Sequence, residues 1–280
     1  MKLQTFACVA AALLAALPAS AQDWAKARVD KSPRHLEWVN VKHDSREVGC
    51  YVGYPEIKDK ATVVLVIHEI YGHSDWVRAM VDELAGAGYI AIAPDLLWGA
   101  GPKGGGTTEL TSTEIGQKIS VLPADQITAD LKAALDYALK LPASNGKAVV
   151  AGFCWGGTQS FRFASNSKDV KAAFVFYGSG PPADAIARIT VPVYGFYAEN
   201  DSRIGATIEA TTGLMKTAGK TYEPVTYAGA GHGFMRAGED PAGSAANKKA
   251  RDDAWKRWMD LLGKISAAPA TPAADKISAK

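Results

Sequence analysis

The sequence predicts an α/β fold in which a mainly parallel, twisted sheet carries helices on both faces. Beyond residue 60, short β-branched or apolar runs alternate with amphipathic segments, as in chains built from βαβ units. One of these runs, TVVLVI at 62–67, is continuously apolar, which is typical of a strand buried on both faces. The 280 residues carry a formal net charge of +2 without a basic block, which argues against nucleic acid or an anionic membrane as partner.

The first 21 residues have the pattern of a signal peptide. One lysine precedes an apolar run of about a dozen residues, and Ala-Ser-Ala at 19–21 has the small-x-small form of a cleavage site. We expect cleavage after Ala21 and a periplasmic or secreted mature protein that does not enter a membrane. A buried N-terminal helix is the alternative. The remaining length of about 260 residues suits one large domain, and we expect a monomer.

The chain divides into a short irregular segment over 22–34, one domain over 35–264 and a disordered, Ala/Pro/Lys-rich tail over 265–280. The domain is expected to open with an antiparallel hairpin around a polar turn at 43–46. Further strands are expected at 62–67, 89–94, 147–153, 172–178, 191–197 and 222–227. Helices are expected from Ser74 to the following glycines and at 123–141, 156–165, 204–218 and 248–263.

The glycine-rich stretch AGPKGGG at 100–106 does not end in Gly-Lys-Ser/Thr and does not open a helix, so a nucleotide site is not expected. We interpret it as a mobile loop at the rim of the sheet, either a lid or a plain connection.

The most informative motif is GFCWG at 152–156, which places Cys154 between two glycines after a strand and before a helix. This is the spacing of a nucleophile elbow with cysteine in place of serine. The elbow turn is strained and brings neighbouring backbone close, so a side chain at either glycine would collide. The motif therefore predicts an α/β-hydrolase fold with Cys154 as nucleophile.

An elbow nucleophile is followed along the chain by an acid and then a histidine. His232, in GAGHGF after the strand at 222–227, is the one histidine downstream of Cys154. Between them, Asp201 follows a strand in the sequence END, with Glu199 as the competing acid. We prefer Asp201, because Glu199 lies nearer the strand and its longer side chain has no evident reason to turn inward.

These residues suit acyl transfer from an ester or lactone. His232 would take the thiol proton and return it to the leaving group, while Asp201 fixes the imidazole tautomer. Water would then cleave the acyl-cysteine. The oxyanion needs backbone N–H donors, from Trp155 and from the loop HEIYG. The two histidines of HEIYGH are five residues apart around a glycine and so fail the zinc-protease pattern; neither a metal nor a cofactor is expected.

The motifs HEIYG, PDL, GFCWGG, END and GHGFMR, in this order, resemble the dienelactone hydrolase family over residues 45–263. The resemblance implies that Glu69 pairs with the resting thiol and releases it when substrate binds. It also implies that Ile70 is the second oxyanion donor and that Arg236 contacts a substrate carboxylate.

One position departs from the family, because the second substrate-binding arginine after PDL is missing and the chain has Trp98 and Gly99 there. We therefore expect a more apolar or larger ester, with Trp98, Tyr71 and Trp155 lining the entrance.

Two other functions stay open at this point. The same residues could pass the acyl group to an alcohol or thiol, which would make the protein an acyltransferase. Alternatively, the protein could be a non-catalytic binding protein in which Cys50 and Cys154 form a structural disulfide, since both remain after the leader is removed.

Overall fold

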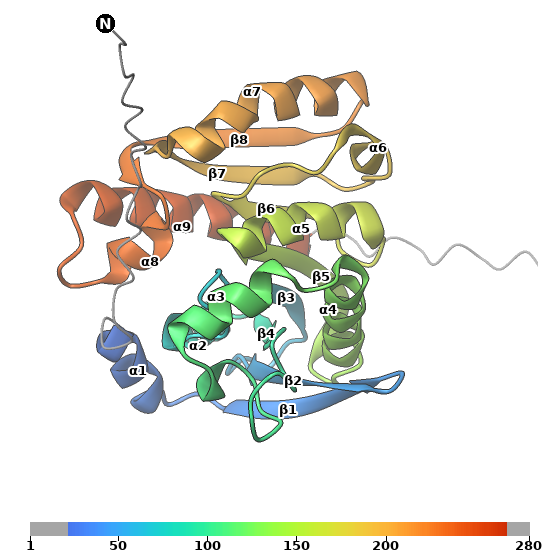
Figure 1. The fold of residues 1–280 in the computed structure, drawn as a ribbon, viewed down its shortest axis with the longest axis vertical. Coiled ribbons are helices and arrows are strands. Elements are labelled where there is room, and N and C mark those ends of the chain that lie inside the picture. The colour runs from blue at the N-terminus through green and yellow to red at the C-terminus, as the bar shows by residue number, and fades with distance from the viewer. Residues whose placement is uncertain (1–21, 268–280) are drawn as a thin grey trace, which may run out of the picture.

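The computed structural model describes residues 22–267, and in this part of the chain an eight-stranded sheet forms the centre. The strand order is β1-β2-β4-β3-β5-β6-β7-β8 (Figure 1). β1 and β2 form an antiparallel hairpin, β2 is antiparallel to β4, and all other neighbours are parallel. The predicted fold class is confirmed. The strands are β1 (Leu36–His43), β2 (Arg46–Gly53), β3 (Ala61–Ile67), β4 (Ile90–Pro94), β5 (Ser144–Phe153), β6 (Ala173–Phe176), β7 (Val193–Asn200) and β8 (Tyr222–Gly231).

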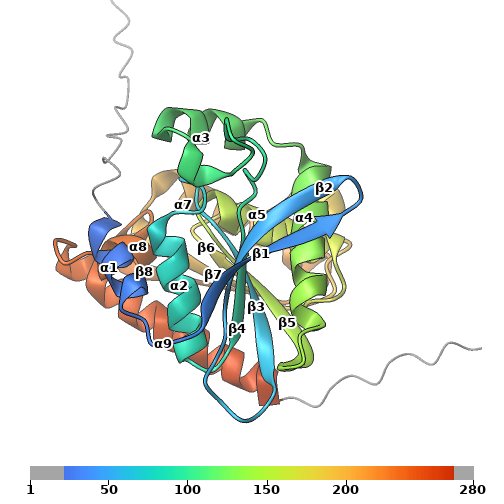
Figure 2. The same ribbon diagram turned by 90° about the horizontal axis from the view of Figure 1, so that it is seen from below.

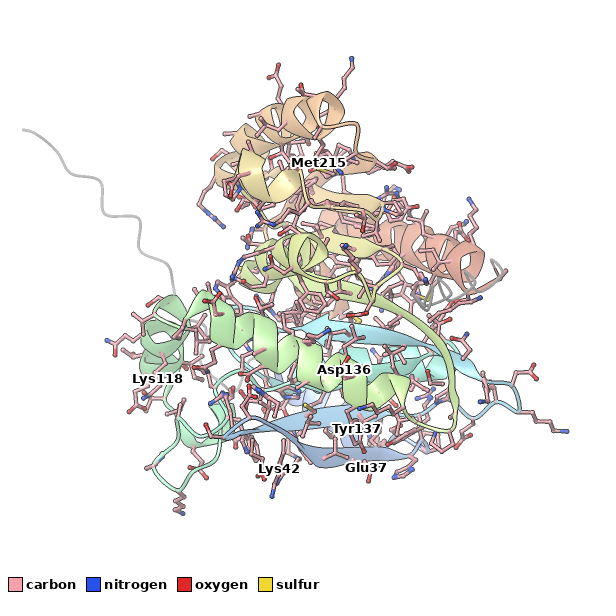
Figure 3. The ribbon with its side chains drawn as sticks, turned by 90° about the vertical axis from the view of Figure 1, so that its right-hand side faces the viewer. Glu37, Lys42, Lys118, Asp136, Tyr137 and Met215 are labelled. Carbon is pink, nitrogen blue, oxygen red and sulfur yellow. The ribbon has the colours of Figure 1, made fainter. Side chains whose placement is uncertain are left out.

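Helices cover both faces of the sheet (Figure 2). One apolar layer is formed under α4 (Ala124–Leu139), α5 (Trp155–Asn166), α6 (Ala183–Ile186) and α7 (Ser202–Thr217). The other lies under α1 (Asp23–Asp30), α2 (Asp75–Gly86), α8 (Phe234–Glu239) and α9 (Ala245–Ala267). Figure 3 shows the extent of the first layer, from Tyr137 of α4 beside the hairpin to Met215 of α7 at the other end of the sheet.

The burial of the central strands explains why their apolar pattern was clear in the sequence. All seven residues of β3 are buried, because this strand lies between β4 and β5 with helices on both faces. The chain leaves β3 to form β4 on one side and later forms β5 on the other side. The carboxyl ends of β3 and β5 therefore flank a topological switch point, where ligands bind in open α/β sheets.

Several boundaries differ from the predicted ones. Residues 22–34 are not irregular throughout, because α1 packs the fully buried Ala25 toward α2. The tail prediction is wrong at its start, since α9 continues to Ala267; the rest of the tail, like the predicted leader at 1–21, lies outside the described residues. Besides α1, three further α-helices were not predicted, namely α3 (Ser112–Ser120), α6 and α8.

The glycine-rich loop at 100–106 is held by its own hydrogen bonds. The Gly105 carbonyl accepts from the N–H groups of Gly99 and Gly101, at 3.1 and 2.9 Å. The Glu109 carboxylate accepts from the N–H groups of Lys103 and Gly105. The loop is thus a compact turn with internal bonds, and whether it also moves as a lid stays a prediction. Along residues 22–267, none of the helices has the length and apolar character to cross a membrane.

Candidate active site

Cys154 lies on a strained turn between β5 and α5, with φ of 55°. The two glycines of the motif permit this turn. A Cβ at Gly152 would lie 1.9 Å from the Gly156 carbonyl oxygen. A Cβ at Gly156 would lie 2.4 Å from the carbonyl oxygens of Ile67 and His68. All three oxygens are backbone atoms that cannot rotate away, so the turn that exposes the thiol requires glycine at each position.

A second strained residue, Tyr177, lies directly after β6 and beside the elbow, with φ of 41°. The Cys154 N–H donates to the Phe176 carbonyl at 3.0 Å, and the buried Tyr177 ring meets the His232 ring edge-on at 5.1 Å. Sequence reasoning missed Tyr177. The glycine that follows it at the end of the predicted strand was the available signal for a sharp turn.

His232 lies between Cys154 and Asp201. Its Nε2 is 3.1 Å from Cys154 Sγ, and its Nδ1 bonds the Asp201 carboxylate. Because a carboxylate only accepts, Nδ1 carries the proton, which leaves Nε2 of the neutral ring able to accept the thiol proton. The three groups come from the ends of β5, β7 and β8, which the parallel topology brings to one edge of the sheet.

The competing acid, Glu199, has another partner. It is exposed, and its Oε2 accepts from the Gly229 N–H at 2.8 Å. Asp201 is buried and also caps α7, since its Oδ1 accepts from the Ile204 N–H at 3.3 Å. The geometry therefore favours Asp201 over Glu199 as the partner of His232.

The two predicted oxyanion donors both face the sulfur. The backbone N–H groups of Trp155 and Ile70 act on the Cys154 sulfur and lower the thiol pKa. Trp155 opens α5, and Ile70 lies in the loop between β3 and α2. These donors flank the switch point from its two sides, as an oxyanion site at the elbow requires.

Burial dominates the ionisation of Cys154. Burial, followed by the nearby Glu69 charge, raises the pKa of the thiol to about 11. The resting thiol is therefore protonated at neutral pH, and nucleophilic attack depends on transfer of its proton to a neighbouring base.

Glu69 pairs with Arg236 instead of the resting thiol. Arg236 Nε donates to Glu69 Oε2 at 2.7 Å, and the Glu69 charge raises the arginine pKa. The Glu69 side chain is only 2% exposed, so an ion pair with a guanidinium compensates its desolvation better than a hydrogen bond to a neutral thiol. Arg236 also lies over the Tyr71 ring, at 5.1 Å from its centre. Both side chains thus lie beside the site, but engaged with each other.

Trp98 is placed differently from the expectation. It packs over Gly49, where a Cβ would lie 2.4 Å from its ring, and stacks on Trp38 with ring centres 5.8 Å apart. Tyr71, by contrast, is 45% exposed beside Arg236, and the Trp155 ring stacks on His68. The sequence alone could not predict this placement of Trp98, because Gly49, the small residue that accommodates its ring, lies on β2 and far away in the sequence.

The disulfide alternative is wrong, because Cys50 and Cys154 are both free thiols. Cys50 belongs to the apolar layer under α4, whereas Cys154 packs against the layer on the opposite face of the sheet. Burial also raises the pKa of Cys50, as expected for an inert core thiol. Within residues 22–267, no group of three or more His, Cys, Asp or Glu side chains is arranged to hold a metal ion.

Replacing Glu69 with glutamine is expected to speed alkylation of Cys154 by iodoacetamide at pH 7. The Glu69 charge raises the thiol pKa, so its removal lowers that pKa and increases the thiolate fraction, by about tenfold per pKa unit. The Arg236 cation, no longer paired with a carboxylate, also lowers the thiol pKa. Alkylation rates across pH, followed by mass spectrometry, measure the effect. Glu199→Gln is the control and should leave the rate unchanged; a slower or unchanged rate in Glu69→Gln would contradict the assignment.

Comparison with known proteins identifies relatives over most of the chain. The model of the dienelactone hydrolase family matches residues 48–266. A Methylorubrum extorquens protein whose carboxymethylenebutenolidase name is provisional is 32% identical over 244 residues, covering 82% of this chain and 81% of that protein. Carboxymethylenebutenolidase 1 of Cupriavidus pinatubonensis is 30% identical, over 78% of this chain and 92% of its own.

Solved structures show the same fold. A provisionally named dienelactone hydrolase from Klebsiella pneumoniae superposes with a TM-score of 0.72 at 24% identity, over 82% of this chain and 99% of that one. A dienelactone hydrolase-like promiscuous phosphotriesterase from metagenomic libraries gives a TM-score of 0.68 at 20% identity, over 84% and 99% of the two chains. The family model and the relatives together show that this chain belongs to the dienelactone hydrolase family, a family of ester and lactone hydrolases.

Proposed function

We propose that this protein hydrolyses carboxylic esters or lactones through an acyl-cysteine intermediate on Cys154. The observation that carries the proposal is the 3.1 Å approach of His232 Nε2 to Cys154 Sγ, with Asp201 bonded to the other ring nitrogen. The nucleophile thus contacts the base, and the base contacts the orienting acid, as covalent acyl transfer requires.

The reaction divides into two steps. His232 accepts the Cys154 proton as the sulfur adds to the carbonyl carbon, and the oxyanion is held by the N–H groups of Ile70 and Trp155. The imidazolium then protonates the leaving oxygen, the C–O bond breaks and the acyl-cysteine forms. Water, deprotonated by His232, adds to the acyl carbon, and collapse of the second oxyanion releases the acid and the thiol.

The surroundings of the site favour an ester without a carboxylate near the scissile bond. Arg236 is held by Glu69, and the position of the missing second arginine is occupied by Trp98 and Gly99. The side chains of Ile70 and Tyr71, 37% and 45% exposed, offer apolar contact instead. A carboxylated lactone would have to draw Arg236 away from Glu69.

We also propose that the protein is exported and processed after Ala21, on the strength of the residue pattern at 1–21. In that case Gln22 becomes the first residue, directly before α1. A free nucleophilic thiol outside the cytoplasm is open to oxidation. Its burial and raised pKa, by limiting the thiolate, reduce that hazard.

The test is hydrolysis of p-nitrophenyl acetate, butyrate and octanoate and of a carboxylated enol lactone by the full chain expressed with its leader. We expect turnover of the esters in preference to the lactone, and a rapidly quenched reaction should carry the acyl mass on the Cys154 peptide. Intact mass reports whether the chain starts at Gln22, and an added primary alcohol reveals acyl transfer as a new ester product. Absence of turnover on all four substrates, or acylation elsewhere, would overturn the proposal.

A further inference from the structure

The motif HEIYGH contains two buried histidines that the proposed triad does not use. Both His68 and His73 are essentially inaccessible to solvent, and burial lowers the pKa of each, which keeps the rings neutral. Only His68 lies beside the predicted oxyanion donors. Its Nδ1 is 2.8 Å from the Glu69 carbonyl oxygen. Because a carbonyl oxygen can only accept, Nδ1 carries the proton and donates it to this bond.

The hydrogen bond from His68 acts on the peptide that contains one oxyanion donor. The Glu69 carbonyl and the Ile70 N–H belong to the same peptide group, which is planar and trans. Fixing the direction of the carbonyl therefore fixes the opposite direction of the N–H. The Gly72 N–H gives the same carbonyl a second bond at 3.1 Å. Together they hold the Ile70 N–H toward the Cys154 sulfur, where it lowers the thiol pKa.

The same imidazole also contacts the residue that supplies the other donor. The rings of His68 and Trp155 stack with centres 5.5 Å apart and planes 16° apart. The Trp155 backbone N–H is the second backbone donor that lowers the Cys154 thiol pKa. His68 therefore contacts the residues that supply both oxyanion donors. Its Nδ1–H bonds the Glu69–Ile70 peptide, and its ring face stacks on Trp155.

A histidine is a costly way to fill a core. The Nε2 of His68 is buried and has no hydrogen-bond partner among the described residues, and an unpaired buried polar atom is destabilising. An apolar side chain would fill the same space without that cost. What histidine adds is a rigid donor at Nδ1 combined with a flat ring.

We propose that His68 is a positioning residue of the oxyanion hole, which orients the Glu69–Ile70 peptide by its Nδ1–H and supports Trp155 by stacking. The proposal rests on the proposed acyl-cysteine chemistry and extends it. His68 does not touch the substrate; it acts through two backbone donors whose direction decides how well they meet the developing negative charge.

Three substitutions separate the two contacts. His68→Phe keeps a stacking ring and loses the donor, whereas His68→Asn keeps an amide N–H near the place of Nδ1 and loses the ring. His73→Phe is the matched control. His73 is buried in the same loop and its Nε2 bonds the Ala93 carbonyl, but its ring packs against Trp38 and Tyr51 instead of Trp155.

The measurements are kcat and KM for p-nitrophenyl butyrate and inhibition by butyraldehyde. The Cys154 sulfur adds to the carbonyl carbon of the aldehyde. The aldehyde oxygen then lies in the oxyanion hole and takes the proton from His232. His68→Phe should lower kcat by about 10- to 100-fold, with little change in KM, and weaken aldehyde inhibition by a similar factor. The thiol pKa, read from alkylation rates across pH, should rise, because the Ile70 N–H is less well aimed. His68→Asn should retain more activity than His68→Phe.

Equal kcat and aldehyde inhibition in His68→Phe and the wild type would overturn the proposal, as would an equal loss in His73→Phe. If His68→Phe does not fold, His68→Asn is compared with His68→Leu, and equal kcat in these two would overturn it. The Cys154→Ala variant separates this proposal from the proposed function. If Cys154→Ala keeps its activity, the acyl-cysteine mechanism itself is contradicted. If Cys154→Ala is inactive but the His68 variants have normal kcat, only the role of His68 is contradicted.

Discussion

Replacing Cys154 with alanine is expected to lower kcat/KM for p-nitrophenyl butyrate by about 10⁴-fold or more, because loss of the nucleophile removes the covalent route and leaves only binding and the oxyanion donors. The thermal unfolding midpoint should change little, since alanine tolerates the elbow no worse than cysteine and the flanking glycines are kept. Steady-state kinetics and a thermal melt measure the two quantities. No acyl mass should appear on the variant.

Cys50→Ala is the matched control for this experiment. Cys50 is the other thiol of the described chain, fully buried in β2 and free of any disulfide. Its replacement should leave kcat/KM unchanged and cost only the packing of one sulfur atom. Hydrolysis that persists in Cys154→Ala, or that disappears in Cys50→Ala with the fold intact, would contradict the assignment of the nucleophile.

The elbow and the order of its partners were predictable because the motif is short and its partners follow it in a fixed order along the chain. Gly152 is required within the turn, where a Cβ would lie 1.9 Å from the Gly156 carbonyl oxygen. Gly156 is required by a tertiary contact, since a Cβ there would lie 2.4 Å from the Ile67 and His68 carbonyl oxygens, but the fixed spacing of the two glycines makes the motif recognisable without knowledge of that contact. The central strands were predictable for a similar reason. Burial on both faces leaves a continuous apolar run, and β3 is buried at every position.

The pairing of side chains around the elbow was not predictable in the same way. Glu69 and Arg236 were each identified, but their ion pair joins residues 167 positions apart, and only the shared edge of the sheet brings them together. The placement of Trp98 over Gly49 depends likewise on the pairing of β2 with β4. The helix α1 has little amphipathic pattern and is stabilised by contacts that include the Arg28 ion pair with Glu239 of α8.

Replacing Asp201 with asparagine is expected to lower either kcat or the stability of α7, because both carboxylate oxygens of Asp201 already accept hydrogen bonds. Oδ2 accepts from His232 Nδ1, and Oδ1 caps α7 by accepting from the Ile204 N–H. Asparagine has only one side-chain acceptor. If its oxygen keeps the cap, its NH₂ group faces His232 and favours the tautomer with the proton on Nε2, which cannot accept from the thiol. The expected loss in kcat is then about 10²- to 10⁴-fold.

If the asparagine oxygen turns to His232 instead, the tautomer is kept and α7 loses its cap, which costs about 1 kcal/mol of unfolding free energy. Measurements of kcat and of urea unfolding on the same variant therefore distinguish the two orientations. Asp201→Ala lacks any side-chain acceptor and should lose both kcat and stability. Glu199→Gln is the control, since Glu199 bonds the Gly229 N–H and should leave kcat unchanged. An Asp201→Asn protein with normal kcat and normal stability would contradict the double role of this carboxylate. Loss of activity in Glu199→Gln would reopen the choice between the two acids.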